Sequence, residues 1–106
     1  MKTALFRRLA LSMPETEEKS HFGKPDFRVK NKIFAGINGQ GFAYVKLLTE
    51  QQTMLKDAEP KLVTPIKGGW GNQGWTQIDQ DNADEALLKS VLQMAWRNVA
   101  PKSLQS

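Results

Sequence analysis

The fold class is indicated by one stretch, Asp26-Phe27-Arg28-Val29-Lys30-Asn31-Lys32-Ile33-Phe34-Ala35-Gly36-Ile37, which has the pattern of a β-hairpin. Phe27 and Val29 alternate with charged residues, as they do in a strand that has one buried face. Asn31-Lys32 is expected to form a tight two-residue connection to a returning strand at residues 33–37. The stretch therefore predicts part of an antiparallel sheet.

Further strands are expected on both sides of the hairpin. Residues 42–47 alternate apolar residues with polar or aromatic ones, so one face of the sheet is expected to meet helices and the other to meet water or a ligand. Shorter strand-like runs occupy residues 19–22 and 75–79. Loops are expected at residues 15–18 and in the segment 59–74, which is rich in Gly and Pro.

Helices are expected at both ends of the chain and once between the strands. Apolar residues spaced three and four apart predict an amphipathic helix over residues 3–13 and another in the last quarter of the chain. Thr49-Glu50-Gln51-Gln52 has the form of a capping box, in which Thr49 and Gln52 satisfy each other's backbone N–H groups. Asp81 or Asn82 is expected to cap the last helix.

The order of these elements predicts a single α+β domain over residues 1–106, in which the N- and C-terminal helices pack on one face of an antiparallel sheet. The chain has 106 residues, of which 40% are hydrophobic and 25% are charged, and this is enough for one core. Residues 102–106 follow Pro101 and are expected to be a frayed tail.

The composition excludes several kinds of site. The chain has no Cys and one His, which rules out disulfides, thiolate zinc sites and two-histidine metal sites. Asp79-Gln80-Asp81-Asn82 lacks the Gly and Glu of a calcium loop, so we expect no metal and no cofactor. Arg7 and Arg8 interrupt the apolar start, and no apolar run is long enough to span a membrane. We therefore expect a cytoplasmic protein with no membrane partner.

His21 is the only side chain suited to acid–base chemistry near neutral pH. Its neighbour Ser20 would point to the opposite face of a strand, so the two residues are not expected to form a catalytic pair. A histidine that packs beside Phe22 is the simpler interpretation. We expect that the protein is not an enzyme.

A glycine-rich segment carries two of the tryptophans. Gly69-Trp70-Gly71-Asn72-Gln73-Gly74 has the glycine spacing of a dinucleotide-binding loop, but a strand is expected after it rather than before it. A flexible or tightly turned loop explains the glycines better. Trp75 is expected to pack on the sheet. Trp70 has few apolar neighbours, and it either stacks on a nucleic-acid base or lies back over the sheet.

Basic residues gather on the hairpin of a chain whose net charge is +4. Arg28 and Lys30 are expected on one face of the strand and Lys24 and Lys32 at its two turns, all within about 10–15 Å of each other. A solvated face that keeps a sheet edge soluble explains the same charges and remains open. The candidate nucleic-acid-binding residues are Lys24, Arg28, Lys30, Lys32, Lys67 and Trp70.

Two segments resemble the signature of the MmcQ/YjbR-like family. The first is His21-Phe22-Gly23-Lys24-Pro25-Asp26-Phe27-Arg28-Val29, followed by Lys32-Ile33-Phe34-Ala35. The second is Trp70-Gly71-Asn72-Gln73-Gly74-Trp75-Thr76, followed by an acidic turn and a closing helix that contains Ala95-Trp96. The resemblance extends from about Leu5 to Pro101.

The resemblance implies an α+β fold similar to CyaY/frataxin, with hairpins in a double-wing arrangement that is often labelled DNA-binding. The candidate wings are residues 24–32 and 67–74. Frataxin-like iron binding is not expected, because the first helix carries Arg7 and Arg8 and no acid precedes Glu15. We expect a non-catalytic module that binds duplex DNA with low sequence specificity. The alternative is a protein-interaction or small-ligand-binding module that uses the sheet face and the Trp loop.

Overall fold

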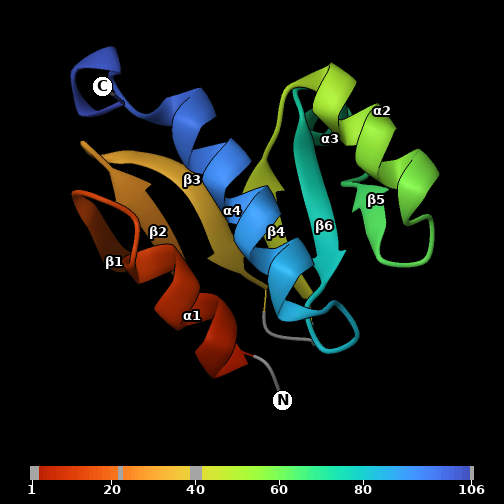
Figure 1. Ribbon diagram of the computed structural model, residues 1–106, viewed down its shortest axis with the longest axis horizontal. Helices are drawn as coiled ribbons and strands as arrows, with labels where there is room; N and C mark the ends of the chain where they lie inside the picture. Colours follow the sequence, from red (N-terminus) through yellow and green to blue (C-terminus); the bar gives the residue numbers. More distant parts are fainter. Residues whose placement is uncertain (1–2, 22, 39–41, 106) are drawn as a thin grey trace.

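The computed structural model describes residues 3–21, 23–38 and 42–105, which form one six-stranded antiparallel sheet with helices against it (Figure 1). The strand order is β1-β2-β3-β4-β6-β5, so β1 and β5 are the edges. The predicted α+β class is confirmed. In chain order the elements are α1 (Thr3–Leu11), β1 (Thr16–His21), β2 (Lys24–Val29), β3 (Lys32–Ile37), β4 (Phe42–Lys46), α2 (Thr49–Ala58), β5 (Val63–Pro65), α3 (Gly69–Asn72), β6 (Trp75–Asp79), α4 (Glu85–Val99) and the short 3₁₀ helix η1 (Lys102–Leu104).

The two terminal helices cover one face of the sheet, as predicted. In Figure 1, α1 and α4 lie in front of the strands; α4 contacts β3 and β4, and α1 contacts β1 and α4. The indole N–H of Trp96 in α4 donates to the carbonyl oxygen of Pro14 at 2.9 Å, which ties the segment after α1 to α4. The core lies between these helices and the sheet. Its largest fully buried side chains include Phe6, Phe27, Phe34, Leu88 and Leu92.

The predicted hairpin is formed by β2 and β3, but its turn lies one residue earlier than expected. Lys30 and Asn31 form the turn with φ angles of 49° and 68°. Positive φ at both central residues matches the right-handed twist of the flanking strands, and Asn tolerates it well. Asn31-Lys32 is therefore wrong as the connection, because Lys32 already belongs to β3.

A β-bulge interrupts the same hairpin. Phe27 pairs with Ala35 and Arg28 pairs with Ile33, so Phe34 is an extra residue in β3. Phe34 is fully buried in the core, whereas Ile33 is partly exposed. The bulge therefore places two consecutive residues, Phe34 and Ala35, in the core, where regular alternation would place only one of them.

Strands and a short helix occupy parts of both predicted loops. β1 begins at Thr16, inside the acidic segment, and pairs with β2 from Thr16 opposite Val29 to His21 opposite Lys24. Its charged sequence lacks an apolar alternation because it is an edge strand, where charge discourages pairing with other chains. The segment 59–74 holds the three-residue strand β5 and the four-residue helix α3.

The start of α2 differs from the predicted capping box. Leu48 precedes the helix, and its N–H donates to Oε1 of Gln51 at 2.9 Å. Gln52 is buried and bonds to other elements, so Thr49 and Gln52 do not cap the helix together. The expected box was placed one residue late.

The ends of α4 also differ from the prediction. Asp84 is the N-cap, and its Oδ1 accepts a hydrogen bond from the N–H of Leu87 at 2.8 Å. Asp81 and Asn82 lie in the turn before it. Beyond α4, residues 102–104 form η1, and Gln105 donates to the carbonyl oxygens of Arg97 and Ala100 at 2.9 and 2.8 Å.

Candidate functional site

The sheet face opposite α1 and α4, which we call the open face, gathers polar and aromatic side chains from four strands. A cross-strand row runs through Asp26, Gly36, Tyr44 and Gln77, which are successive partners in β2, β3, β4 and β6. Lys46 and Trp75 form the neighbouring pair. Because antiparallel partners on one face lie within contact distance, residues far apart in the sequence meet here. The open face comprises Asp26, Arg28, Ile33, Gly36, Tyr44, Lys46, Trp75 and Gln77.

An aromatic pair forms the centre of the open face. The rings of Tyr44 and Trp75 meet edge to face, with centroids 5.6 Å apart and an interplanar angle of 70°. The Nζ atom of Lys46 lies 5.2 Å from the centroid of the Trp75 ring, within the range of a cation–π interaction. Lys46 also donates to the carbonyl oxygen of Gln73 at 2.5 Å. Trp75 is thus held in place on the sheet, as predicted for this residue.

A hollow of about 350 Å³ lies beside this pair, and Trp70 forms one of its walls. Trp70 is 63% exposed, the largest exposure among the large hydrophobic residues of the described chain. The walls are mainly apolar, with one lysine among them. The lining residues are Lys24, Ile33, Asn38, Tyr44, Ile66, Trp70 and Trp75.

Two glycines fix the segment that carries Trp70. A Cβ atom on Gly71 would overlap the carbonyl oxygen of Ile66, and one on Gly74 would overlap that of Leu47. Gly74 also has a φ of 98°, which L-residues with side chains rarely adopt. Close backbone packing thus explains these two glycines, and the segment is tightly turned, which is one of the two predicted forms.

Gln52 anchors the same segment from α2. Its side-chain Nε2 donates to the carbonyl oxygen of Gly71 at 3.1 Å and to Oγ1 of Thr76 at 3.0 Å, and it lies 3.3 Å from the carbonyl oxygen of Trp75. A buried amide with such partners is costly to remove, because each acceptor would lose its partner away from water. Gln52 therefore fixes α3, and with it Trp70, relative to β6.

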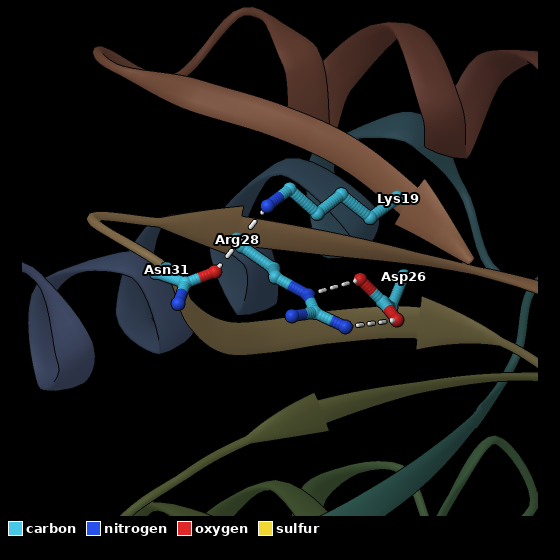
Figure 2. Close-up of polar contacts among 4 residues, drawn as sticks. All are labelled: Lys19, Asp26, Arg28 and Asn31. Atoms are coloured by element: carbon cyan, nitrogen blue, oxygen red, sulfur yellow. Dashed lines mark hydrogen bonds and ion pairs between the residues drawn. The ribbon is translucent and has the colours of Figure 1, made fainter. Parts of the chain in front are cut away.

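An ion pair occupies the β2 side of the open face (Figure 2). Arg28 Nε donates to Oδ1 of Asp26 at 2.8 Å, and its second nitrogen, Nη2, donates to Oδ2 at 3.2 Å. Asp26 is fully buried, so its charge is matched within the protein. The hydrogen bond with Asp26 raises the pKa of Arg28 above its ordinary value, although burial acts in the opposite direction. Most of the positive charge of Arg28 is thus already compensated.

The ring of Tyr44 lies over Gly36, and Gly36 is the residue next to Asp26 in the cross-strand row. A Cβ atom on Gly36 would overlap the end of the Tyr44 ring, so only glycine leaves room for this ring. Burial raises the pKa of Tyr44, and the negative charge of Asp26 raises it further, whereas Arg28 lowers it. The phenol therefore stays protonated, and able to donate a hydrogen bond, beyond its usual range.

The predicted basic residues do not form one cluster. Lys24 begins β2, whereas Lys30 and Lys32 lie at the far end of the hairpin, roughly 20 Å away at 3.3 Å per strand residue. The expectation that four cations lie within about 10–15 Å is therefore wrong. Lys30 lies in the turn, where its Nζ is 3.3 Å from a carboxylate oxygen of Glu15. Lys67 is exposed in the connection between β5 and α3.

A further lysine of β1 reaches the hairpin turn. Nζ of Lys19 donates to Oδ1 of Asn31 at 3.4 Å (Figure 2). Together with the pairs made by Arg28 and Lys30, this contact shows that several hairpin cations already have partners within the protein. Lys24, Lys32 and Lys67 remain exposed side chains with which an anion can form contacts.

Other kinds of site find little support. His21 ends β1. Its side chain and Phe22 lie outside the described residues, and the prediction that the two pack together lies there too. The described part of the chain holds no group of three or more His, Asp or Glu side chains placed to bind a metal ion. Within the same residues, no helix is both long and apolar enough to cross a membrane.

Comparison with known proteins places the chain in a family. A family model described as YjbR matches residues 11–98. The chain belongs to the YjbR family. It is similar in structure to the Deinococcus radiodurans protein DR2400, whose crystal structure is assigned to a domain named DUF419; the TM-score is 0.72, the identity is 20%, and the match covers 85% of this chain and 72% of that one. At this identity the likeness shows the fold alone. No curated protein matches.

The YjbR match includes both segments that resemble the family signature. Around them, the structure adds residues that the motif did not single out: Tyr44 and Lys46 of β4, and Gln52 of α2. The alternation in residues 42–47 had indicated a polar face that meets water or a ligand, and this was the signal for Tyr44 and Lys46. No comparable signal marked Gln52, because its partners are 19 and 24 residues away in the sequence.

Proposed function

We propose that this member of the YjbR family is a non-catalytic DNA-binding module of low sequence specificity, and that the open face is its main contact surface. One observation carries the proposal: the hollow beside Trp75 combines an exposed indole with a lysine on its wall. Aromatic rings for bases and cations for phosphates are the two components of nucleic-acid binding without sequence readout.

The phosphate contacts are assigned to Lys24 and Lys67 beside the hollow and to Lys32 at the exposed end of the hairpin, rather than to the whole basic hairpin. Arg28 is neutralised by Asp26, and Lys30 is near Glu15. With three phosphates neutralised, the logarithm of the association constant should fall with the logarithm of salt concentration at a slope of about −2.7 on duplex DNA. Binding should thus weaken roughly fortyfold between about 50 and 200 mM salt.

The non-catalytic part of the proposal rests on the state of the charged groups on the open face. Asp26 is the one fully buried carboxylate among the described residues, and Arg28 holds both of its oxygens. A carboxylate held in this way is a poor general base, because taking up a proton would break the ion pair.

A small-ligand-binding module is the second candidate, since the hollow itself favours it. Its volume of about 350 Å³ falls in the range of small-molecule sites, and its walls are mainly apolar. Such a ligand would bind with little dependence on salt but would lose affinity when Trp70 is replaced by Ala. The salt dependence therefore separates the two candidates.

The test is fluorescence anisotropy of a labelled random-sequence DNA at about 50 and 200 mM salt. Reversing Lys24, Lys32 and Lys67 to Glu should abolish binding. The control reverses Arg8, Lys89 and Lys102, which are exposed on α1, α4 and η1 and change the net charge equally. Equal loss in both variants would show that net charge alone attracts DNA, and absence of binding by the unmodified protein would reject the function. Arg28 is left intact, because a second carboxylate beside Asp26 would endanger the fold.

A further inference from the structure

We propose that the hollow beside Trp75 receives one unpaired base of single-stranded DNA, whose phosphate on one side lies against Lys24. This inference rests on the proposed function and specifies its preferred substrate. The lining and the charge of the hollow support this inference. The fixed ring of Trp75 and the fixed backbone of α3, which carries Trp70, support it further.

The lining of the hollow suits a flat, apolar-faced group. Tyr44, Trp70 and Trp75 supply three aromatic side chains, and Ile33 and Ile66 complete the apolar wall. A nucleobase offers two π-faces for stacking and places its polar groups at its edge. Trp70 is 63% exposed, so a base that covers it removes apolar surface from water.

The charges around the hollow favour a phosphate backbone over a neutral ligand. Lys24 belongs to the wall, and no acidic residue is among the described residues that line it. Lys67 follows Ile66 directly in the chain, so it lies close to the opposite wall. A single DNA strand whose phosphates contact Lys67 and Lys24 would cross the hollow and place one base over it.

The base must be unpaired for this contact to form. In a duplex both π-faces of each base are covered by the neighbouring pairs, so an aromatic side chain reaches a base face only in a single strand, at an end or in a flipped nucleotide. The open face is a sheet surface rather than a wedge that enters a groove. Single-stranded DNA is therefore the form that matches the hollow.

The two indoles have different roles in this arrangement. Trp75 is fixed by the ring of Tyr44 and by Lys46, so it forms a preformed floor. Trp70 sits on α3, whose backbone is held by Gln52, while its own side chain is free of the core. Because Trp75 is already fixed and little of the backbone around Trp70 has to move, the entropic cost of ordering the site on binding is low.

The experiment compares a labelled oligo-dT of about 12 nucleotides with a duplex of the same length at about 50 mM salt. We expect the single strand to bind at least about tenfold more tightly. Trp70→Ala should weaken single-strand binding by about tenfold to hundredfold and leave the weaker duplex binding unchanged. Trp70→Phe should restore part of the affinity. Met54→Ala, which removes another exposed apolar side chain on α2, is the matched control and should have no effect.

The alternatives give different results. Equal binding of duplex and single strand, without an effect of Trp70→Ala, would overturn this inference and leave the proposed function standing on its lysines. Absence of binding to either DNA would reject both. If the free mononucleotide dTMP competes as strongly as the oligonucleotide, the hollow binds a small anionic ligand and the single-strand inference is wrong. Circular dichroism and chemical denaturation of each variant establish that the fold is intact.

Discussion

The two faces of the sheet are made by the same strands but from different kinds of side chain. On the face toward α1 and α4, residues such as Phe34, Val45 and Ile78 are fully buried and apolar. On the open face, Tyr44 and Trp75 are only partly buried. Their rings meet edge to face, Lys46 lies over the ring of Trp75, and the charges of Asp26 and Arg28 act on the pKa of Tyr44. The comparison indicates that the face covered by α1 and α4 carries most of the stability of the fold.

The sharpest test of this comparison uses the bulge, where Phe34 and Ile33 are adjacent but face opposite ways. Phe34→Ala should lower the free energy of unfolding by about 3–5 kcal/mol, because it empties part of the core. Ile33→Ala, on the open face, should cost only about 1 kcal/mol. Chemical denaturation of both variants measures the difference. Similar losses would mean that the open face is as much a part of the core as the covered face.

A second test asks whether the open face depends on backbone packing rather than on apolar burial. Gly74→Ala should destabilise the protein by roughly 2–4 kcal/mol, since it combines a strained φ with an overlap against the backbone of Leu47. Gly69→Ala is the control in the same segment, because its Cβ atom would enter open space, and it should cause no loss. Thermal unfolding of the two variants gives the comparison; equal melting temperatures would contradict the role assigned to Gly74.

The smallest expected effect concerns Tyr44 and alkaline pH. Its raised pKa means that the folded protein keeps the phenol proton at a pH at which the unfolded chain has lost it. The stabilisation is complete below the unfolded pKa of about 10 and declines as the pH rises through the folded pKa. Tyr44→Phe should therefore show a weaker fall in stability above about pH 10.

The same group can be observed directly, because Tyr44 is the only tyrosine in the chain. Its phenolate absorbance should appear with a midpoint above the ordinary tyrosine value of about 10 in the folded protein. In denaturant the midpoint should return to that value. A midpoint at the ordinary value in the folded protein would show that the ring is more open to water than the structure places it.

Much of the fold could be predicted from the sequence wherever the apolar side chains recurred with a clear helical or strand period. The hairpin, the alternation in β4 and the apolar stripe of α4 each gave the right element. The strand predicted at residues 19–22 was placed too late, because β1 runs over Thr16–His21 and an edge strand rich in Glu and Lys has no apolar alternation that marks its start. β5 and α3 were missed because elements of three and four residues are too short to show a period.

The candidate site was harder to predict from the sequence, since it depends on which segments the sheet brings together. Trp70 and Lys24 were candidate binding residues from the sequence, which left open whether Trp70 is exposed, and the structure places both on one hollow. The neutralisation of Arg28 was not foreseen, although Asp26 is only two residues away, because alternation alone does not say whether a carboxylate on that face is buried.

The hydrogen bond from Trp96 to Pro14 fixes one of the three tryptophans in the helix layer. The chain has three tryptophans in three different environments: Trp96 of α4 is buried, Trp75 is packed on the open face, and Trp70 is exposed. Indole emission depends on the polarity around the ring. The protein therefore carries optical reporters of its own: Trp96 for the integrity of the helix layer, and Trp70 for events on the opposite side of the sheet.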